Sequence, residues 1–339
     1  MYIGVDIGGT FIKGVITNTE GKVLSFKKVP TGKTADDIDN IICQLVDNLI
    51  QASEVQKRSL KAIGIGAAGA IDIKKGIVIT SPNIGAWENY PLAAKIEKKV
   101  GIRVFLENDA NVAVVGEWWQ GNGKKYRNWI MLTLGTGIGG GAVIDNKFYT
   151  GQSGSSMEFG HTTIDYRGKT CNCGNRGCLE QYASASALVR MAKAGLKKAG
   201  SSTLHDRLKD ETISAKMIHE EALRGDVFCI DILTELAFYL GIGVSNLVNI
   251  FNPQAVIFGG GLSRAHAQRD IPFYVLDNDD RVIDHDADGE YETEQRQVVE
   301  REAESGEEEQ RADQRDGDSD DGNDGRPPRL QEQDDDEHD

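Results

Sequence analysis

Cysteine is scarce in this chain, which holds five cysteines among 339 residues. We therefore do not expect a secreted disulfide framework, because it needs densely spaced cysteines in a small domain, and we expect no secretory leader before residues 1–4. Long apolar runs are missing as well. The runs at 130–134 and 255–258 are far shorter than the roughly 20 residues of a membrane-spanning helix. We expect a cytoplasmic protein that has no membrane partner.

Lysine is absent from residues 265–339, which contain 28 Asp and Glu against 8 Arg. The net charge of this segment is -20, whereas residues 1–264 carry a net +5, so the acidity of the chain belongs to the segment. A segment so charged and so poor in apolar residues cannot offset its ordering entropy by burial, and we predict a disordered acidic tail. The diffuse positive excess of the remainder forms no basic stripe, so we expect no nucleic-acid partner.

Short apolar strands alternate with amphipathic helices through the first 264 residues, which favours an α/β architecture. The clearest helix covers 35–53, where apolar residues recur at helical spacing behind two acids. The length of the chain fits two domains of ordinary size. The other predicted strands are 2–7, 11–16, 23–29, 62–67, 78–81, 104–106, 129–134, 142–144 and 255–258, and the other predicted helices are 91–99, 110–119, 188–199, 214–224 and 227–249.

A glycine-rich turn between two predicted strands occurs twice, at Gly8-Gly9-Thr10 and within LGTGIGGG, residues 134–141. We predict that LGTGIGGG as a whole forms the second turn, which leads into the strand at 142–144. This weak internal repeat suggests two similar domains that face each other, with turns whose backbone N–H groups clamp a polyphosphate. Taken alone, the first turn could equally be an ordinary hairpin turn, because glycine is the usual residue of tight turns.

Neither turn carries a familiar nucleotide signature. No Gly-Lys-Ser/Thr follows either one, so neither is a Walker loop. Both turns lead into a strand rather than a helix, which does not fit a dinucleotide fingerprint. Asp6 precedes the first turn at a position suited to Mg²⁺ or its water, and Thr10 adds a hydroxyl. A third glycine run, 259–261, follows the last predicted strand.

Asp109 lies where a predicted strand passes into the helix at 110–119. One interpretation is structural, because Asp is a common helix N-cap that accepts the first N–H groups. The functional interpretation is a general base, since phosphoryl transfer to a hydroxyl needs a carboxylate near the attacking oxygen. Asn83 and Asn108 could then bind the hydroxyls of a sugar ring.

A compact set of zinc-type ligands consists of His161, Cys171, Cys173 and Cys178. One imidazole and three thiolates complete a tetrahedral structural zinc site, and the intervening glycines let a tight knuckle bend around the metal. The alternative is a redox pair or plain buried thiols. Ordering the knuckle would also fix two neighbouring carboxylates, Glu158 and Glu180, which suit hydrogen bonding to the hydroxyls of a polyol.

Taken together, these motifs resemble the ROK family of sugar kinases and repressors. The resemblance extends from Met1 to about Ser263 and is carried, in this order, by DIGGTFIK, ENDAN, LGTGIGGG, EFGH, CNCGNRGC followed by LEQY, and NPQAVIFGGGLS. Family repressors carry a helix-turn-helix domain before the kinase-like part. Here DIGGT begins at residue 6, so we expect no DNA-reading domain.

The resemblance implies an α/β, two-domain actin/hexokinase-like (ribonuclease H-like) fold with ATP and sugar in an interdomain cleft. The N-terminal domain would cover 1–115, and a larger domain, 116–264, would hold the zinc knuckle. The family continues beyond Ser263 with more strand and helix, including a final helix that packs back onto the first domain. The second domain is therefore expected to be C-terminally incomplete and to be followed by the disordered acidic tail, 265–339.

The resemblance also implies roles for individual residues. Asp109 would be the catalytic base. The phosphates and nucleotide would lie at Asp6, Gly8, Gly9, Thr10, Lys13, Thr136, Gly137, Gly259, Gly260 and Gly261; the sugar at Asn83, Asn108, Glu158, His161 and Glu180; and structural Zn²⁺ at His161, Cys171, Cys173 and Cys178.

The activity implied by the resemblance is ATP- and Mg²⁺-dependent phosphorylation of a hexose, with glucose converted to glucose 6-phosphate as the leading reaction. Relatives of this type are commonly homodimers. Two alternatives stay open. The first is a non-catalytic sugar-binding or regulatory protein with a defective nucleotide site, and the second is a kinase for N-acetylmannosamine, N-acetylglucosamine or fructose.

Overall fold

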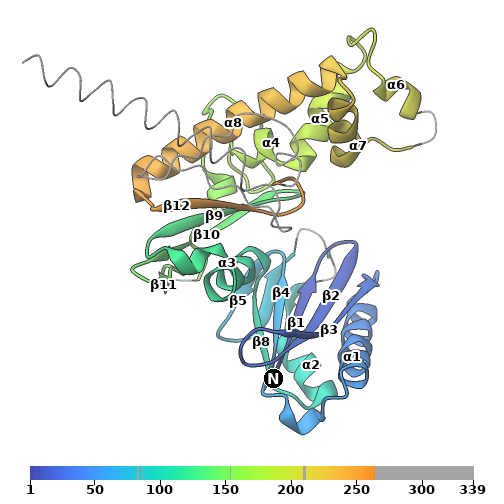
Figure 1. Cartoon of the computed structure of the whole chain (residues 1–339), viewed down its shortest axis with the longest axis vertical. Helices are drawn as coiled ribbons and strands as arrows, with labels where there is room; N and C mark the ends of the chain where they lie inside the picture. The colour runs from blue at the N-terminus through green and yellow to red at the C-terminus, as the bar shows by residue number, and fades with distance from the viewer. Residues whose placement is uncertain (82–83, 86, 153, 209–210, 264–339) are drawn as a thin grey trace, which may run out of the picture. The chain divides into compact units, whose positions relative to one another are not determined.

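The computed structural model describes residues 1–81, 84–85, 87–152, 154–208 and 211–263 (Figure 1). All of these residues belong to one compact unit. The sugar-binding prediction at Asn83 and the predicted disordered tail, 265–339, lie outside the described residues.

The N-terminal sheet has five strands in the order β3-β2-β1-β4-β8. Its hairpin strands β1, β2 and β3 pair antiparallel, whereas β4 pairs parallel with both β1 and β8. Alternation along β1 buries Ile3, Val5 and Ile7 on one face and leaves Asp6 on the other. The strands are β1 (Tyr2–Ile7), β2 (Phe11–Thr17), β3 (Val23–Pro30), β4 (Ala62–Ala67) and β8 (Val104–Asn108).

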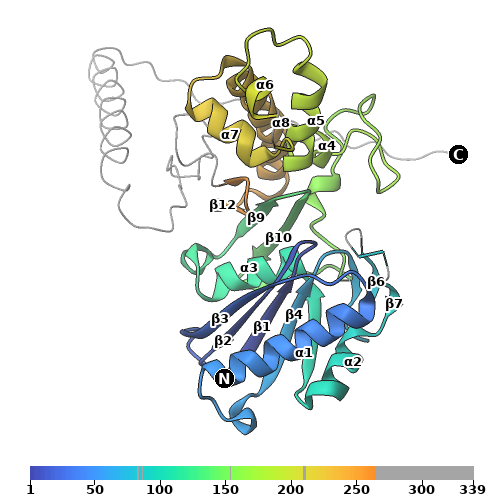
Figure 2. The same cartoon turned by 90° about the vertical axis from the view of Figure 1, so that its right-hand side faces the viewer.

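Two helices, α1 (Ala35–Ala52) and α2 (Leu92–Val100), pack on the buried face of this sheet (Figure 2). Helix α1 begins with a capping box between Thr34 and Asp37, as its leading acids suggested. The opposite face of the sheet forms an apolar groove that reaches Asp6. Phe26 and Phe105 in this groove remain 58% and 53% exposed, so this face is much less covered than the helix-bearing one.

The second sheet has the order β11-β10-β9-β12. Its strands are β9 (Trp129–Leu134), β10 (Ile138–Ile144), β11 (Lys147–Phe148) and β12 (Ala255–Gly259). One face, which includes Ile130 and Leu132, packs under the helices that Figure 1 shows on that side of the sheet. These helices are α4 (Glu180–Ala183), α5 (Ala185–Gly195), α7 (Ala215–Leu223) and α8 (Val227–Phe251).

Helix α3 (Asp109–Trp119) packs on the other face of the second sheet, where Val114 meets Trp129 and Met131. It also contacts β4 and β8 of the first sheet. Glycines of β10 permit the close approach, because a Cβ on Gly139 would lie 2.7 Å from the Cβ of Ala110. The prediction that LGTGIGGG is entirely a turn is therefore wrong. The turn comprises its first glycines, and β10 already begins at Ile138.

Smaller elements complete the described part of the chain. A three-stranded sheet was missed in part from the sequence, because two of its strands have only three residues each. These elements are β5 (Ala70–Asp72), β6 (Ile77–Thr80), β7 (Glu88–Tyr90), α6 (Leu204–Arg207) and the 3₁₀ turns η1 (Lys57–Ser59), η2 (Asn122–Lys125) and η3 (Phe159–His161).

Helix α8 is long and apolar enough, by length and composition alone, to cross a membrane. Its sequence contains no long uninterrupted apolar run, because polar residues such as Glu235, Ser245 and Asn246 lie within it. In the structure its buried residues, among them Leu236 and Leu240, join the apolar cluster under the second sheet. The apolar character of α8 is thus accounted for, on that face, by packing within the protein.

Candidate active site

The first glycine turn joins β1 to β2 and is held mainly by backbone hydrogen bonds. The Gly8 N–H donates to the Phe11 carbonyl at 3.1 Å, which closes the turn. Thr31, just after β3, donates its N–H to the Thr10 carbonyl at 3.0 Å and its hydroxyl to the Gly8 carbonyl at 2.7 Å. Gly9 and Thr10 stay exposed at the tip. No sequence motif pointed to Thr31, since a lone threonine after a strand carries no signal.

Asp6 and Lys13 face each other across β1 and β2 beside this turn. The Lys13 Nζ lies 2.8 Å from the Asp6 Oδ2, and both side chains are about half exposed, at 49% and 48%. The pair places one anion and one cation at the mouth of the turn. Both groups were predicted to act on phosphate or Mg²⁺, and the strand register brings them together.

The second glycine turn joins β9 to β10. Within it, the Gly135 N–H donates to the Gly137 carbonyl at 2.9 Å, and Thr136 is exposed at the tip. Two groups from α4 and the start of α5 hold it from outside. The Ile138 N–H donates to the Glu180 Oε2 at 3.0 Å, and the Ala185 N–H donates to the Gly135 carbonyl at 2.9 Å.

The third glycine run, Gly259 to Gly261, lies beside the second turn because β12 runs parallel to β9. Gly260 has φ +96°, a conformation that favours glycine, and a Cβ there would lie 2.4 Å from the Leu134 carbonyl oxygen. The same carbonyl accepts the Leu262 N–H at 3.0 Å. Two of the three predicted nucleotide segments therefore form one continuous edge.

Asn108, and not Asp109, is the N-cap of α3. Its Oδ1 accepts the N–H groups of Ala110 and Asn111 at 2.9 and 3.2 Å, and its Nδ2 donates to the Gly69 carbonyl at 3.2 Å. The interpretation of Asp109 as the cap is therefore wrong, because the preceding residue performs that task. Asp109 accepts only the Ala110 N–H, at 2.9 Å, among the hydrogen bonds of the described residues, and it remains accessible to solvent.

Asp109 is accessible, yet enough protein surrounds its carboxylate to reduce its hydration. This partial burial raises the pKa of Asp109 above its usual 3.8; the hydrogen bond from Ala110 opposes the shift, and the charge of Asp6 reinforces it. Burial likewise raises the pKa of Glu158, against the charge of His161 and together with the charges of Asp109 and Glu180. The predicted acids thus act on one another electrostatically. A carboxylate of raised pKa in such a group is a better proton acceptor.

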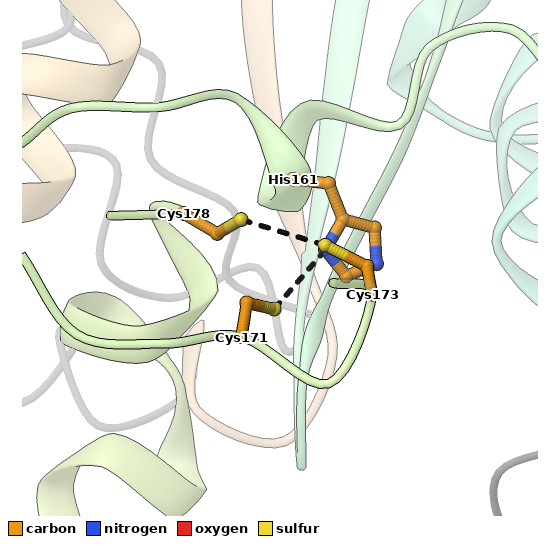
Figure 3. Close-up of side chains that lie close together, drawn as sticks. All are labelled: His161, Cys171, Cys173 and Cys178. Atoms are coloured by element: carbon orange, nitrogen blue, oxygen red, sulfur yellow. Dashed lines mark hydrogen bonds between the residues drawn. The ribbon is translucent and has the colours of Figure 1, made fainter. Parts of the chain in front are cut away.

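The predicted zinc ligands converge in the structure (Figure 3). The ligand atoms of His161, Cys171, Cys173 and Cys178 all lie within 4.8 Å of one another. The Cys173 and Cys178 sulfurs are 3.7 Å apart, close to the distance of about 3.8 Å that two Zn–S bonds of about 2.3 Å give at the tetrahedral angle. Four donors, and not two thiols alone, converge here, so the donor set fits a metal site.

Local backbone geometry shapes the knuckle. Gly174 and Gly177 have φ +92° and +69°, and a Cβ on Gly177 would collide with the Asp165 backbone. Burial alone would raise the pKa of the Cys171 thiol, but hydrogen bonds from Cys173 and Gln181 lower it to about 7. A thiol that ionises near neutral pH is suited to metal binding. Gln181 is a neighbour of the site that the sequence motif contained but did not assign.

The chain matches the model of the ROK family over residues 2–271. It is 42% identical to the glucokinase of Streptomyces coelicolor, across 78% of this chain and 82% of the relative. It is 34% identical to the xylose repressor of Caldicellulosiruptor bescii, across 77% of this chain and 66% of the repressor.

Among solved structures, the chain resembles a ROK family glucokinase from Streptomyces griseus in complex with glucose and AMPPNP. The TM-score is 0.68 at 42% identity, and the match covers 78% of this chain and 84% of the other. This similarity confirms the predicted actin/hexokinase-like α/β class. The family match covers well over half of the chain and includes the segments that build the candidate site. The chain therefore belongs to the ROK family.

Proposed function

We propose that this protein is a sugar kinase that transfers the γ-phosphoryl group of ATP to the 6-hydroxyl of glucose. The observation that carries the proposal is the accessible Asp109 carboxylate, whose pKa is raised, in a chain 42% identical to glucokinases. The Streptomyces griseus relative binds glucose together with an ATP analogue. Such a kinase needs a general base, a phosphate cradle and a sugar pocket, and candidates for all three are present.

In the proposed reaction, Asp109 accepts the proton of the sugar 6-hydroxyl as that oxygen attacks the γ-phosphorus. A new O–P bond forms, the bond from the γ-phosphorus to the β–γ bridging oxygen breaks, and ADP leaves with the electron pair of that bond. The N–H groups of the exposed turn residues Gly9 and Thr136 would donate to phosphate oxygens. Asp6 would hold Mg²⁺ or its water, and the ion would neutralise phosphate charge.

The sugar would contact Asn83, Asn108, Glu158, His161 and Glu180. Asn108 already uses its oxygen as a helix cap and one amide hydrogen on the Gly69 carbonyl, so it offers the sugar at most one further amide hydrogen. Domain closure over the sugar would exclude water and limit ATP hydrolysis.

The remaining parts of the proposal concern the structural metal, the two domains, the localisation and the oligomeric state. The four-residue zinc knuckle would hold a structural Zn²⁺ that shapes the sugar side of the site. Domains of 1–115 and 116–264 would form the two halves of the cleft, with α3 near their boundary because it contacts both sheets. We further propose a cytoplasmic homodimer.

The decisive experiment is ATP-dependent phosphorylation by the purified chain of glucose, fructose, mannose, N-acetylmannosamine and N-acetylglucosamine. We expect glucose to be the best substrate and Asp109→Asn to lack the activity. Preference for one of the amino sugars or fructose would keep the kinase and replace the substrate. Absence of turnover on every sugar, from folded and zinc-loaded protein, would reject the kinase.

The second candidate is a sugar-binding regulatory protein without catalysis. The similarity to the xylose repressor favours it, because the kinase-like fold also occurs in family members named as regulators. Calorimetric titration separates the two candidates. Glucose binding without AMPPNP binding would support the regulatory protein, whereas binding of both ligands supports the kinase.

A further inference from the structure

The second glycine turn is fastened to the zinc knuckle by one side chain. The Glu180 carboxylate accepts the Ile138 N–H, the first backbone donor after the turn. It lies so close that a Cβ on Gly137 would be only 2.1 Å from the Glu180 Oε2. Gly137 is therefore glycine partly to admit this carboxylate, a role that a phosphate turn by itself does not require.

The opposite side of the same residue is held by η3. A Cβ on Gly160 would lie 2.0 Å from the Ile138 carbonyl oxygen, so the two backbones are in close contact. Phe159 packs equally tightly on Gly140, where a Cβ would lie 2.3 Å from its ring. The Ile138 N–H is thus hydrogen-bonded to Glu180, and the backbone of Gly160 lies against the Ile138 carbonyl.

The two segments that contact Ile138, at Gly160 and at Glu180, both lie next to zinc ligands in the sequence. Gly160 immediately precedes His161, and Glu180 follows Cys178 by two residues. These two segments also contact each other: the Leu179 N–H donates to the Thr162 carbonyl at 2.9 Å, and Thr163 and Cys178 form a β-bridge. An ion bound at the cluster would therefore fix both segments.

The contacts with Ile138 leave the tip of the turn available to a ligand. Within the described residues, the N–H groups of Thr136 and Gly137 have no hydrogen-bond partner, whereas that of Gly135 is used inside the turn. An unanchored glycine turn must lose much conformational freedom when it binds a phosphate. An anchored one has already lost it, so its donors bind more tightly.

We propose that Glu180 is a positioning residue for the nucleotide: together with the zinc knuckle it holds the second glycine turn in its phosphate-binding shape. This inference rests on the proposed function of the turn and adds a role to the sugar contact expected of Glu180. It makes the zinc cluster a support of the ATP side of the site as well as of the sugar side. The first glycine turn has no such dependence, because its own strands and Thr31 hold it.

The test compares Glu180→Ala with Glu180→Gln in protein without sugar, so that a sugar contact has no influence. The amide oxygen of glutamine can still accept the Ile138 N–H, whereas alanine cannot. We expect AMPPNP affinity, measured by calorimetry, to fall about tenfold in Glu180→Ala and about threefold or less in Glu180→Gln. Unchanged affinity in Glu180→Ala would overturn the inference.

Amide hydrogen exchange provides a readout that is independent of catalysis. In Glu180→Ala, exchange of the two hydrogen-bonded amides of the second turn, Gly135 and Ile138, should accelerate at least tenfold, while exchange of the hydrogen-bonded Gly8 amide in the first turn stays constant. Zinc removal by a chelator should have the same selective effect. Glu158→Ala is the matched control, because it removes a neighbouring acid that makes no hydrogen bond to the turn in the described structure. Zinc content must equal that of the wild type in both alanine variants.

The outcomes separate the two hypotheses. If the wild type phosphorylates no hexose but Glu180→Ala loosens the turn and weakens AMPPNP binding, the kinase is rejected and the anchor stands. If the wild type is an active kinase but exchange at Gly135 and Ile138 is unchanged in Glu180→Ala, the anchor is rejected. If the wild type binds no AMPPNP, exchange at Gly135 and Ile138 alone decides, and unchanged rates there overturn the inference.

Discussion

The two glycine turns have the same predicted task, yet the protein holds them by different means. The first is fixed beside its own sheet, by the Gly8–Phe11 hydrogen bond and by Thr31, which directly follows β3. The second is fixed from outside, by Glu180 and Ala185, which follow the zinc knuckle in the chain. Similar motifs in sequence can therefore depend on different parts of the fold for their shape.

This difference predicts unequal sensitivity. A turn closed by short-range backbone bonds persists as long as its hairpin persists. A turn held by long-range contacts is lost when a distant element is disturbed, because those contacts must first overcome the entropy of bringing the segments together. The second turn should accordingly be the one that responds to metal and to substitutions outside it.

We expect the largest effect, a loss of turnover, at Asp109, because both turns should bind the nucleotide of the one reaction in which Asp109 is the base. We expect Asp109→Asn to reduce kcat on glucose by a factor of about 10²–10⁴, the usual contribution of a general base. Nucleotide affinity should be nearly unchanged, because neither turn is touched. Asp145→Asn is the matched control: it replaces an exposed turn residue at φ +52°, which asparagine adopts readily. Retained turnover in Asp109→Asn would remove the proposed base.

Removing a zinc ligand should disturb the second turn and leave the first unchanged. Cys178→Ser is expected to lose the metal and to destabilise the protein by about 4 kcal/mol or more, as for other losses of a structural metal. Metal content by mass spectrometry and unfolding by denaturant measure this. Cys43→Ser, which alters a thiol outside the cluster, should keep its zinc. A stable, metal-free wild type would contradict the structural role.

Two glycine substitutions compare the turns directly. Gly137→Ala must displace Glu180, since the new Cβ would lie 2.1 Å from its carboxylate oxygen, whereas Gly8→Ala meets only the Phe11 carbonyl at 3.1 Å. We expect AMPPNP affinity to fall about tenfold in the first variant and about threefold or less in the second. Calorimetric titration of both measures the ratio. Equal losses would show that the two turns are supported alike.

The smallest effect is a dependence of stability on pH. Folding raises the pKa of Asp109, so its protonated form stabilises the folded state below the unfolded value of 3.8, and this contribution is lost as pH rises through the folded pKa. At neutral pH the ionised carboxylate is therefore destabilising. Asp109→Asn should raise Tm at pH 7 relative to the wild type, with a smaller gain below pH 4. A gain that is constant across this range would argue against the shift.

Much of the architecture follows from local pattern. Periodicity located α1, α3 and α8 to within a few residues, because long amphipathic or apolar helices leave a regular spacing. The same reasoning misjudged LGTGIGGG, since Gly139 and Gly141 are glycines for the close approach of α3 and not for a turn. It also left open whether Asp109 caps α3, and in the structure Asn108 is the cap. The error at LGTGIGGG concerns glycines whose purpose depends on a helix distant from them in sequence.

The sequence by itself determined the motifs: their order, the identity of the four zinc-type ligands, the acid at the start of α3 and the family to which the chain belongs. Those features are readable because each depends on residue type and short spacing. Only the tertiary structure decided that Asp6 pairs with Lys13, that Asp109 is free of capping duty, and that Glu180 reaches the turn at Ile138. Contacts of this kind arise when packing brings separate segments together, and no local pattern records them.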